Sequence, residues 1–261
     1  MLGFLEYFLF IFFIKLYVIA KLCKQSSKVR FMVKKSRFLR QQKVFAALLG
    51  IAAIGILITL FWQTFQTGSN SQIIEGRDYS LVEKPRRIRG ERIEVIEFFS
   101  YACVHCYRLE PILKDWIPNQ KDQIEFVQIP AVMSDYWSIL GKHYYTLKRL
   151  EKLESHHIGI FNAIHSSGRT FDSEAKLFDF VKTTNIEFGD YEKIYRSIEV
   201  KSDIQRASQM ARRLRIAAVP TFVVQGKYIV KTGRDIGLKR AKQVVEFLID
   251  KELETKQETN I

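Results

Sequence analysis

The stretch IEVIEFFSYACVHC, residues 93–106, places two cysteines directly behind a run of apolar residues. The apolar run Ile93–Phe99 predicts a buried strand, and the residues after Cys106 predict a helix. This order places Cys103 at a helix N-terminus, where unpaired N–H groups and the helix dipole favour a thiolate over a thiol. Two thiols at CxxC spacing can also close a small ring reversibly. The stretch therefore predicts thiol–disulfide exchange.

Other chemistries of a CxxC motif fit the rest of the chain less well. A structural zinc site needs four ligands, usually with a second Cys/His pair, and no cysteine follows Cys106. Covalent haem attachment needs a histidine directly after the second cysteine, where this chain has Tyr107. A static structural disulfide is the remaining alternative, so the surroundings of the motif must distinguish it from a reactive one.

The positive charge of the chain is concentrated near its N-terminus. The chain has 261 residues and a formal net charge of +13. Residues 1–72 hold ten Lys/Arg and one acid, a net charge of +9, which leaves +4 for the other 189 residues. The excess of basic residues near the N-terminus is therefore a sign of membrane topology, and it does not predict nucleic-acid binding.

Residues 44–62 form an uncharged apolar stretch that, as a helix about 28 Å long, would span a bilayer. Basic residues precede this stretch. The positive-inside rule then predicts that residues 1–43 are cytoplasmic and that the chain after Trp62 lies across the membrane. A cleaved signal peptide is the competing interpretation, although its apolar core is usually shorter.

Residues 1–31 leave two further alternatives open. The first twenty residues are apolar apart from Glu6 and Lys15, so they could form a second membrane segment. Translation could instead begin at Met32, which would give a short basic region followed by the apolar helix. Cys23 lies in this region, on the predicted cytoplasmic side, and it is assigned no role because thiols there stay reduced.

The rest of the chain predicts one α/β domain interrupted by a helical insertion. A β-α-β order comes first, the hydrophobic period then changes to about 3.6, and two strands and an amphipathic helix follow. Ser173 (or Asp172), Asp190 and Ser202 are the predicted N-caps in the helical part. The predicted boundaries are a tether at 63–72, a first α/β part at 73–136, the helical insertion at 137–215 and a second α/β part at 216–261.

Three segments of the chain resemble disulfide oxidases of the DsbA type. They are EFFSYACVHCY (residues 97–107), LVEKP (residues 81–85) and VPTFVVQGKY (residues 219–228). The resemblance implies a thioredoxin-like α/β fold with an inserted all-helical domain, here preceded by the transmembrane helix. It also implies that the reactive group is the Cys103–Cys106 disulfide, without a metal or other cofactor.

Within the motif, Cys103 is expected to be the sulfur that a substrate thiolate attacks, and Cys106 the buried leaving group. His105 lies inside the ring, where its N–H can favour the Cys103 thiolate; a plain surface histidine is the alternative. Val104 departs from the family, which has proline at this place. Valine restores a backbone N–H, which would favour the thiolate, and it lacks the fixed φ of proline, which would oppose this effect. No direction of change in the redox potential is therefore predicted.

Outside the motif, Glu97 shares a strand face with apolar residues. We expect a buried carboxyl with a raised pKa that exchanges a proton with Cys106; an exposed strand-end glutamate is the alternative. Glu110 either tunes the local charge or is a solvated helix residue. The Val219–Pro220 bond is expected to be cis and to lie against the motif, where Val219 pairs with an extended substrate; a trans proline opening a strand is the alternative. No role is assigned to the other histidines, His143, His156, His157 and His165.

These patterns favour a thiol oxidase anchored in the bacterial inner membrane, with its catalytic domain in the periplasm. Its substrates would be reduced, unfolded secreted or periplasmic proteins, and the resemblance implies regeneration by a quinone-linked thiol oxidase of the membrane. A monomer is expected. A reductase or isomerase with the same site is the first alternative. A membrane-tethered chaperone or binding module with a structural disulfide is the second, and it leaves His105, Glu97 and Val219–Pro220 unexplained.

Overall fold

The computed structural model describes residues 48–50, 54–59, 72–88, 90–233 and 236–259. The chain divides into two compact units, Met1–Asn70 and Ser71–Ile261, each considered by itself. In the first unit, the described residues are helical.

The predictions for residues 1–43, for Cys23 and for most of the tether lie outside the described residues, as does much of the apolar stretch 44–62. In the part of the chain that is described, no helix is both long enough and apolar enough to cross a membrane.

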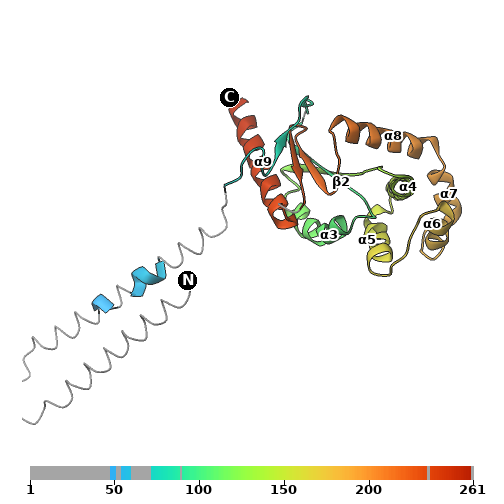
Figure 1. The fold of residues 1–261 in the computed structure, drawn as a ribbon, viewed down its shortest axis with the longest axis horizontal. Coiled ribbons are helices and arrows are strands. Elements are labelled where there is room, and N and C mark those ends of the chain that lie inside the picture. The colour runs from blue at the N-terminus through green and yellow to red at the C-terminus, as the bar shows by residue number, and fades with distance from the viewer. Residues whose placement is uncertain (1–47, 51–53, 60–71, 89, 234–235, 260–261) are drawn as a thin grey trace, which may run out of the picture. The chain divides into compact units, whose positions relative to one another are not determined.

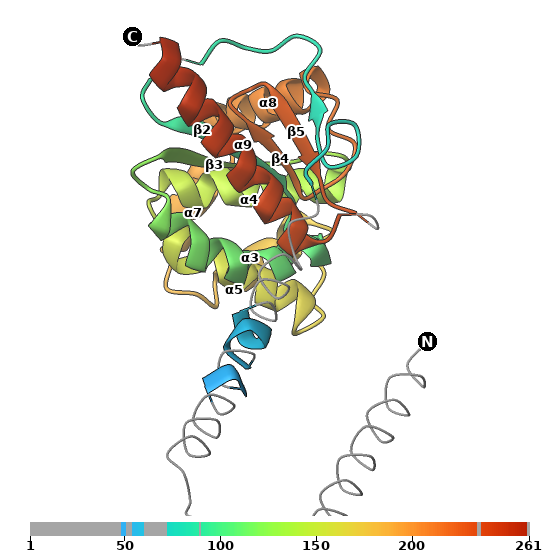
Figure 2. The same cartoon turned by 90° about the vertical axis from the view of Figure 1, so that its left-hand side faces the viewer.

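A five-stranded sheet forms the centre of the second unit (Figures 1 and 2). Its strands, in sheet order, are β1 (Ser80–Leu81), β5 (Tyr228–Lys231), β4 (Thr221–Val224), β2 (Ile93–Phe99) and β3 (Ile124–Pro130). Strand β2 pairs in parallel with β3, and the other neighbours pair antiparallel. The predicted strand at 93–99 is confirmed, and it lies between β4 and β3.

Helices cover both faces of this sheet, as the apolar composition of β2 predicts. On one face, α3 (Val104–Trp116) and α9 (Leu238–Thr259) pack on the side chains of Val95 and Val224 (Figure 2). On the other face, α8 (Ile198–Arg213) packs on Ile96, Phe98 and Val223 (Figure 1). The apolar side chains of β2 are therefore buried on both faces of the sheet, and Glu97 between them is removed from water, whereas Glu94 near the start of the strand stays 18% exposed.

Five helices lie between β3 and β4, so the predicted helical insertion is present. They are α4 (Asp135–Arg149), α5 (Leu153–His165), α6 (Glu174–Val181), α7 (Phe188–Tyr195) and α8. Their core is continuous with the cysteine motif, because Tyr101 and Cys106 belong to the same buried cluster as Leu147, Phe161 and Leu177. The element order is β-α-β, helices, then β-β-α, which is the order of the thioredoxin-like fold predicted above.

The helix caps in the insertion were only partly predicted. Ser173 caps α6 by accepting a hydrogen bond from the Lys176 N–H, as expected. The predicted cap Asp190 is wrong: Glu187 caps α7 through the Gly189 N–H, and Asp190 lies in the first turn. The predicted cap Ser202 is also wrong, because Ser197 caps α8 and Ser202 lies inside that helix. In both cases an acceptor earlier in the chain begins the helix.

The docking of α9 on the sheet generates a stability prediction. Leu248 is fully buried in the cluster under α9, whereas Leu81 on the edge strand is 53% exposed. Leu248→Ala is expected to lower the free energy of unfolding by about 2–5 kcal/mol, because it leaves a cavity. Leu81→Ala, the same chemical change, should cost less than about 1 kcal/mol. Urea unfolding followed by circular dichroism measures both, and equal losses would contradict the packing described here.

Candidate active site

The two cysteines lie where the chain passes from β2 into α3. Cys103 has an extended backbone (φ −94°, ψ 116°) and forms the N-cap, and α3 begins at Val104. Among the described side chains, none caps this helix end, so its N–H groups are available to the Cys103 sulfur. Both thiols are free; Cys103 is partly exposed and Cys106 is buried. The predicted placement at a helix N-terminus is confirmed.

The surroundings of Cys103 lower its pKa to about 6. The largest cause is the hydrogen bond with the Cys106 thiol, followed among the lowering effects by the backbone N–H groups of Cys106 and His105 and by the charge of the His105 ring. Burial acts in the opposite direction.

Cys106 has the opposite electrostatic environment. Burial raises the pKa of its thiol far above the ordinary value, and the nearby charges of Glu97 and Cys103 raise it further. The two sulfurs are therefore unequal: one is a stable thiolate near neutral pH, and the other must be protonated whenever it is released.

The Glu97 side chain is completely buried on the face of β2 that α3 covers. Burial, reinforced by the Glu110 carboxylate, raises its pKa to about 8, although a hydrogen bond from Gln128 acts to lower it. Oε2 accepts that bond from Gln128 Nε2 at 2.9 Å, while Oε1 has no hydrogen-bond partner in the described part of the chain. The expected burial and raised pKa of Glu97 are both present.

A buried polar network extends from Glu97 into the helical insertion. Gln128 Nε2 also donates to Glu110 Oε1 at 3.0 Å. His157 Nε2, from α5, lies 3.1 Å from the same Glu110 oxygen, and His157 Nδ1 lies 2.8 Å from the Tyr101 hydroxyl. Glu110 is therefore part of this network; the alternative of a solvated helix residue is excluded, because its side chain is only 14% exposed.

Sequence reasoning missed Gln128, Tyr101 and His157. Gln128 stands opposite Glu97 in the β2–β3 register, and a glutamine in an apolar strand is a signal that could have pointed to it. His157 had no such signal, because α5 reaches Glu110 only through the fold. The remaining histidines have other contacts: His143 binds the Tyr191 hydroxyl, His156 binds Asn185 and His165 binds the Tyr101 carbonyl.

The loop before β4 lies directly against Cys103. The Val219–Pro220 peptide bond is cis, as predicted. The Cys103 sulfur lies 3.4 Å from the Val219 carbonyl oxygen, to which it donates a hydrogen bond when it is protonated. Thr232 of the chain after β5 holds the Pro220 carbonyl through a side-chain hydrogen bond of 2.8 Å. The backbone at Val219 thus adjoins the reactive sulfur and is fixed from the neighbouring strand.

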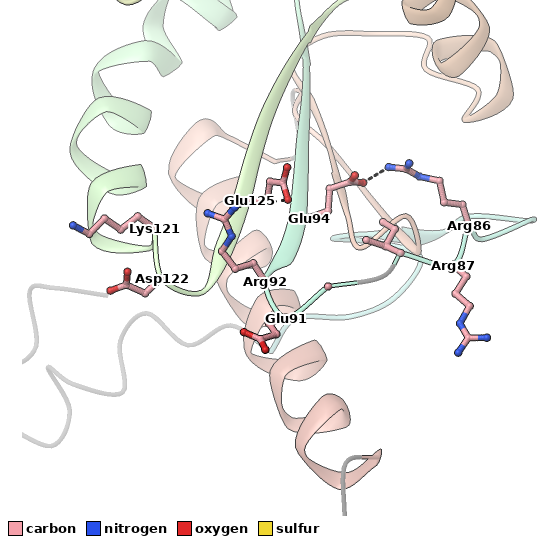
Figure 3. A pocket seen from close by; sticks show the side chains of 10 residues that line it. Arg86, Arg87, Glu91, Arg92, Glu94, Lys121, Asp122 and Glu125 are labelled. Carbon is pink, nitrogen blue, oxygen red and sulfur yellow. Dashed lines mark hydrogen bonds and ion pairs between the residues drawn. The ribbon is translucent and has the colours of Figure 1, made fainter.

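A polar cavity of about 1030 Å³ lies at the other end of the sheet, where β2 and β3 begin (Figure 3). Four of its charged side chains form the ion pairs Arg86–Glu94 and Arg92–Glu125. It contains no thiol and is remote from the cysteines along β2, so it is not part of this site. In the part of the chain that is described, no three His, Cys, Asp or Glu side chains are arranged to hold a metal ion.

Comparisons with known proteins agree on one family. The model of the DSBA-like thioredoxin domain matches residues 141–247. The thiol:disulfide interchange protein DsbA of Pseudomonas syringae pv. tomato is 34% identical over 204 residues, covering 77% of this chain and 94% of that protein. The DsbA of Azotobacter vinelandii is 31% identical and covers 78% of this chain and 96% of that protein.

The fold is also similar to solved structures. The crystal structure of Pseudomonas aeruginosa DsbA superposes with a TM-score of 0.67 at 27% identity, covering 71% of this chain and 97% of that one. DsbA from Xylella fastidiosa gives a TM-score of 0.63 at 26% identity, with 69% and 97% covered.

The lowered pKa of Cys103 predicts how the reduced protein titrates. Its thiolate should form with a midpoint near pH 6 instead of 9.0. Because this pKa is depressed by folding, the stability it contributes is complete above the unfolded value and is lost as the pH falls through about 6. The ultraviolet absorbance of the thiolate measures the midpoint. Cys103→Ser should abolish the transition and Cys106→Ser should retain it; a midpoint near 9 in the native chain would contradict the arrangement.

The raised pKa of Glu97 predicts a pH-dependent cost of folding. Between pH 4.5 and about 8 the folded state loses stability as the pH rises, because the buried carboxyl resists ionisation. Glu97→Gln carries no charge, so it should stabilise the reduced protein by about 2–4 kcal/mol at pH 8 and by little at pH 4. Denaturant unfolding at the two pH values tests this, with the exposed Glu125→Gln as the matched control. A gain that is equal at both pH values would show that Glu97 is not the titrating group.

Proposed function

We propose a direction, a substrate class and a location for this chain, which belongs to the DsbA family of thiol:disulfide oxidoreductases. It acts as an oxidase that donates the Cys103–Cys106 disulfide to reduced, unfolded secreted or periplasmic proteins. The observation that carries the direction is the lowered pKa of Cys103. A stabilised thiolate favours the reduced form of the site, so its disulfide is a strong oxidant.

The reaction begins with attack on the exposed sulfur. A substrate thiolate attacks Cys103, the bond between Cys103 and Cys106 breaks, and a mixed disulfide with Cys103 forms. The electron pair of the broken bond leaves on Cys106. The second thiolate of the substrate then attacks the substrate sulfur of the mixed disulfide and releases Cys103 as a thiolate. The substrate dithiol has lost two electrons to become a disulfide, and the site has gained them as a dithiol.

Glu97 supplies the proton that the leaving group needs. The Cys106 thiolate is buried and has a strongly raised pKa, so it must be protonated as it leaves. Glu97 has a pKa of about 8, holds a proton at neutral pH and lies near enough to Cys106 for its charge to affect that thiol. Proton transfer from Glu97 to Cys106 produces the neutral thiol and a carboxylate. Because the pKa of Glu97 is about 8 in the reduced site, the carboxylate then regains a proton from solvent at neutral pH, and the reduced protein again has a neutral Glu97.

The backbone at Val219 aligns the substrate. Its carbonyl oxygen lies 3.4 Å from the Cys103 sulfur, so an extended chain that pairs with Val219 brings its own cysteine close to that sulfur. Backbone pairing of this kind has little preference for sequence. His105 acts from the surface side of the ring through its charge, which favours the Cys103 thiolate.

The location and partners extend this proposal. The apolar stretch 44–62 anchors the chain in the bacterial inner membrane, and the tether 63–72 leads to a periplasmic catalytic domain, with α/β parts at 73–136 and 216–261 around the insertion 137–215. A quinone-linked thiol oxidase of the membrane reoxidises the cysteines, and the protein works as a monomer. The composition of the N-terminal region and its basic flank support the anchor.

Thiol trapping in intact cells tests the direction. The Cys103–Cys106 pair should be largely oxidised at steady state, because the strongly oxidising disulfide is continually regenerated. Cys103→Ser and Cys106→Ser should both abolish the oxidation of client proteins, since neither variant can form the Cys103–Cys106 disulfide that a client thiolate attacks. A largely reduced pair would favour a reductase or isomerase. An unchanged cellular phenotype in Cys103→Ser would instead favour a binding module, and either result would overturn the oxidase.

A further inference from the structure

We propose that His157, which the helical insertion contributes, is a positioning residue: it holds Glu110 ionised and thereby keeps the single proton of the two carboxyls on Glu97. The inference rests on the proposed oxidase chemistry, which uses that proton at Cys106. Nothing in the sequence pattern singles out this histidine, and it touches neither sulfur in the described contacts. It acts on the reaction through Glu110.

The contact between His157 and Glu110 is largely shielded from water. The two side chains are 12% and 14% exposed, and Nε2 lies 3.1 Å from Oε1. The atoms are at ion-pair distance but are not aligned as a hydrogen bond. The aromatic rings of Phe99, Tyr144 and Phe161 pack edge-on against the imidazole. Such surroundings strengthen an electrostatic contact, because little water screens it.

The second nitrogen of His157 also has a partner, which limits where the ring hydrogens lie. Nδ1 lies 2.8 Å from the Tyr101 hydroxyl. If Tyr101 donates this bond, Nδ1 is the acceptor and the ring hydrogen is on Nε2. If the ring is an imidazolium, Nε2 again carries a hydrogen. The third form would leave a bare Nε2 lone pair 3.1 Å from the Glu110 oxygen, which is repulsive. In both favourable forms Nε2 carries a hydrogen, so the positive end of an N–H group lies beside Glu110 Oε1, without the alignment of a hydrogen bond.

Gln128 determines where the proton of Glu97 lies. Its Nε2 donates one hydrogen to Glu97 Oε2 and the other to Glu110 Oε1, so both of these oxygens are acceptors. A proton on Glu97 must then be on Oε1, the buried oxygen without a partner among the described residues. Glu110 accepts one N–H from Gln128 and also lies 3.1 Å from Nε2 of His157, so it is the better site for the negative charge.

The two carboxyls therefore have unequal surroundings, and His157 contributes to the difference. Without His157, Glu110 would keep only the hydrogen bond from Gln128, which is also the one donor that Glu97 has. The two carboxyls would then compete for the single proton. A proton on Glu110 is of no use to the leaving sulfur. The titratable or charged groups that face this pair or His157 are Cys103 and Cys106 at the start of α3, Tyr101 before it, Tyr144 and His143 on α4, and His156 on α5 itself.

The test compares His157→Gln with the matched control His156→Gln in the full-length chain. The first readout is the infrared C=O band of a protonated carboxyl in the reduced protein. In the native chain the band should disappear in Glu97→Gln and persist in Glu110→Gln. In the His157→Gln variant the proton should be shared between Glu97 and Glu110. Adding Glu97→Gln to this variant should therefore remove only part of the band. His156→Gln should leave the native assignment unchanged, because His156 contacts Asn185 and not Glu110.

The second readout is the rate at which the oxidised protein oxidises a dithiol peptide, measured against pH. His157→Gln should lower this rate roughly two- to tenfold at neutral pH, because a tenfold loss corresponds to about 1.4 kcal/mol of proton preference. Tyr101→Phe removes the hydroxyl that contacts Nδ1 but keeps the imidazole of His157. It should change the band and the rate in the same direction as His157→Gln. This variant keeps the test open if His157→Gln does not fold.

The outcomes separate this inference from the proposed function. A native chain that does not oxidise the peptide would refute the oxidase, while the infrared assignment would still report on His157. A native chain that does oxidise the peptide, together with an unchanged band and rate in both His157→Gln and Tyr101→Phe, would refute the role of His157 alone.

Discussion

The burial of one carboxyl in the central strand constrains everything around the cysteines. An isolated charge at Glu97 would be costly in this interior, so the side chain is held neutral near pH 7 with a pKa of about 8. The neutral acid is also a proton source beside a sulfur that cannot remain ionised. Gln128, Glu110 and His157 then divide charge and proton between two carboxyls. The chemistry of the exposed Cys103 depends on this buried arrangement beneath it.

Local patterns in the sequence predicted the elements that carry the reactive sulfurs. The β2 run, the helix that begins after Cys103, the burial of Glu97 and the cis bond before Pro220 each follow from neighbouring residues or a familiar motif. The partners of Glu97 were not predictable in this way. Gln128 reaches it through strand register, and His157 reaches Glu110 from a helix 47 positions along the chain. Hydrophobic period carries no information about either contact.

The errors within the insertion have a related cause. Asp190 and Ser202 are reasonable caps by composition, but Glu187 and Ser197 precede them and satisfy the first free N–H groups. Several acceptors lie near each helix start, and only the packing of α7 and α8 selects one. The same packing joins the insertion to the motif through one continuous cluster that includes Tyr101 and Cys106. The insertion is thus part of the redox site and cannot be regarded as an accessory to it.

The contact between Cys103 and the Val219 carbonyl bears on which proteins this site can serve. A backbone oxygen offers the same hydrogen bond to every sequence, so recognition at this position depends on whether a chain can present an extended segment. A folded protein has already used its backbone groups internally and has few to offer. Under the proposed function, selection is then made by the folding state of the client, and the site acts on a chain before that chain has folded. The same contact that orients the sulfur therefore also sets the time at which it can be used.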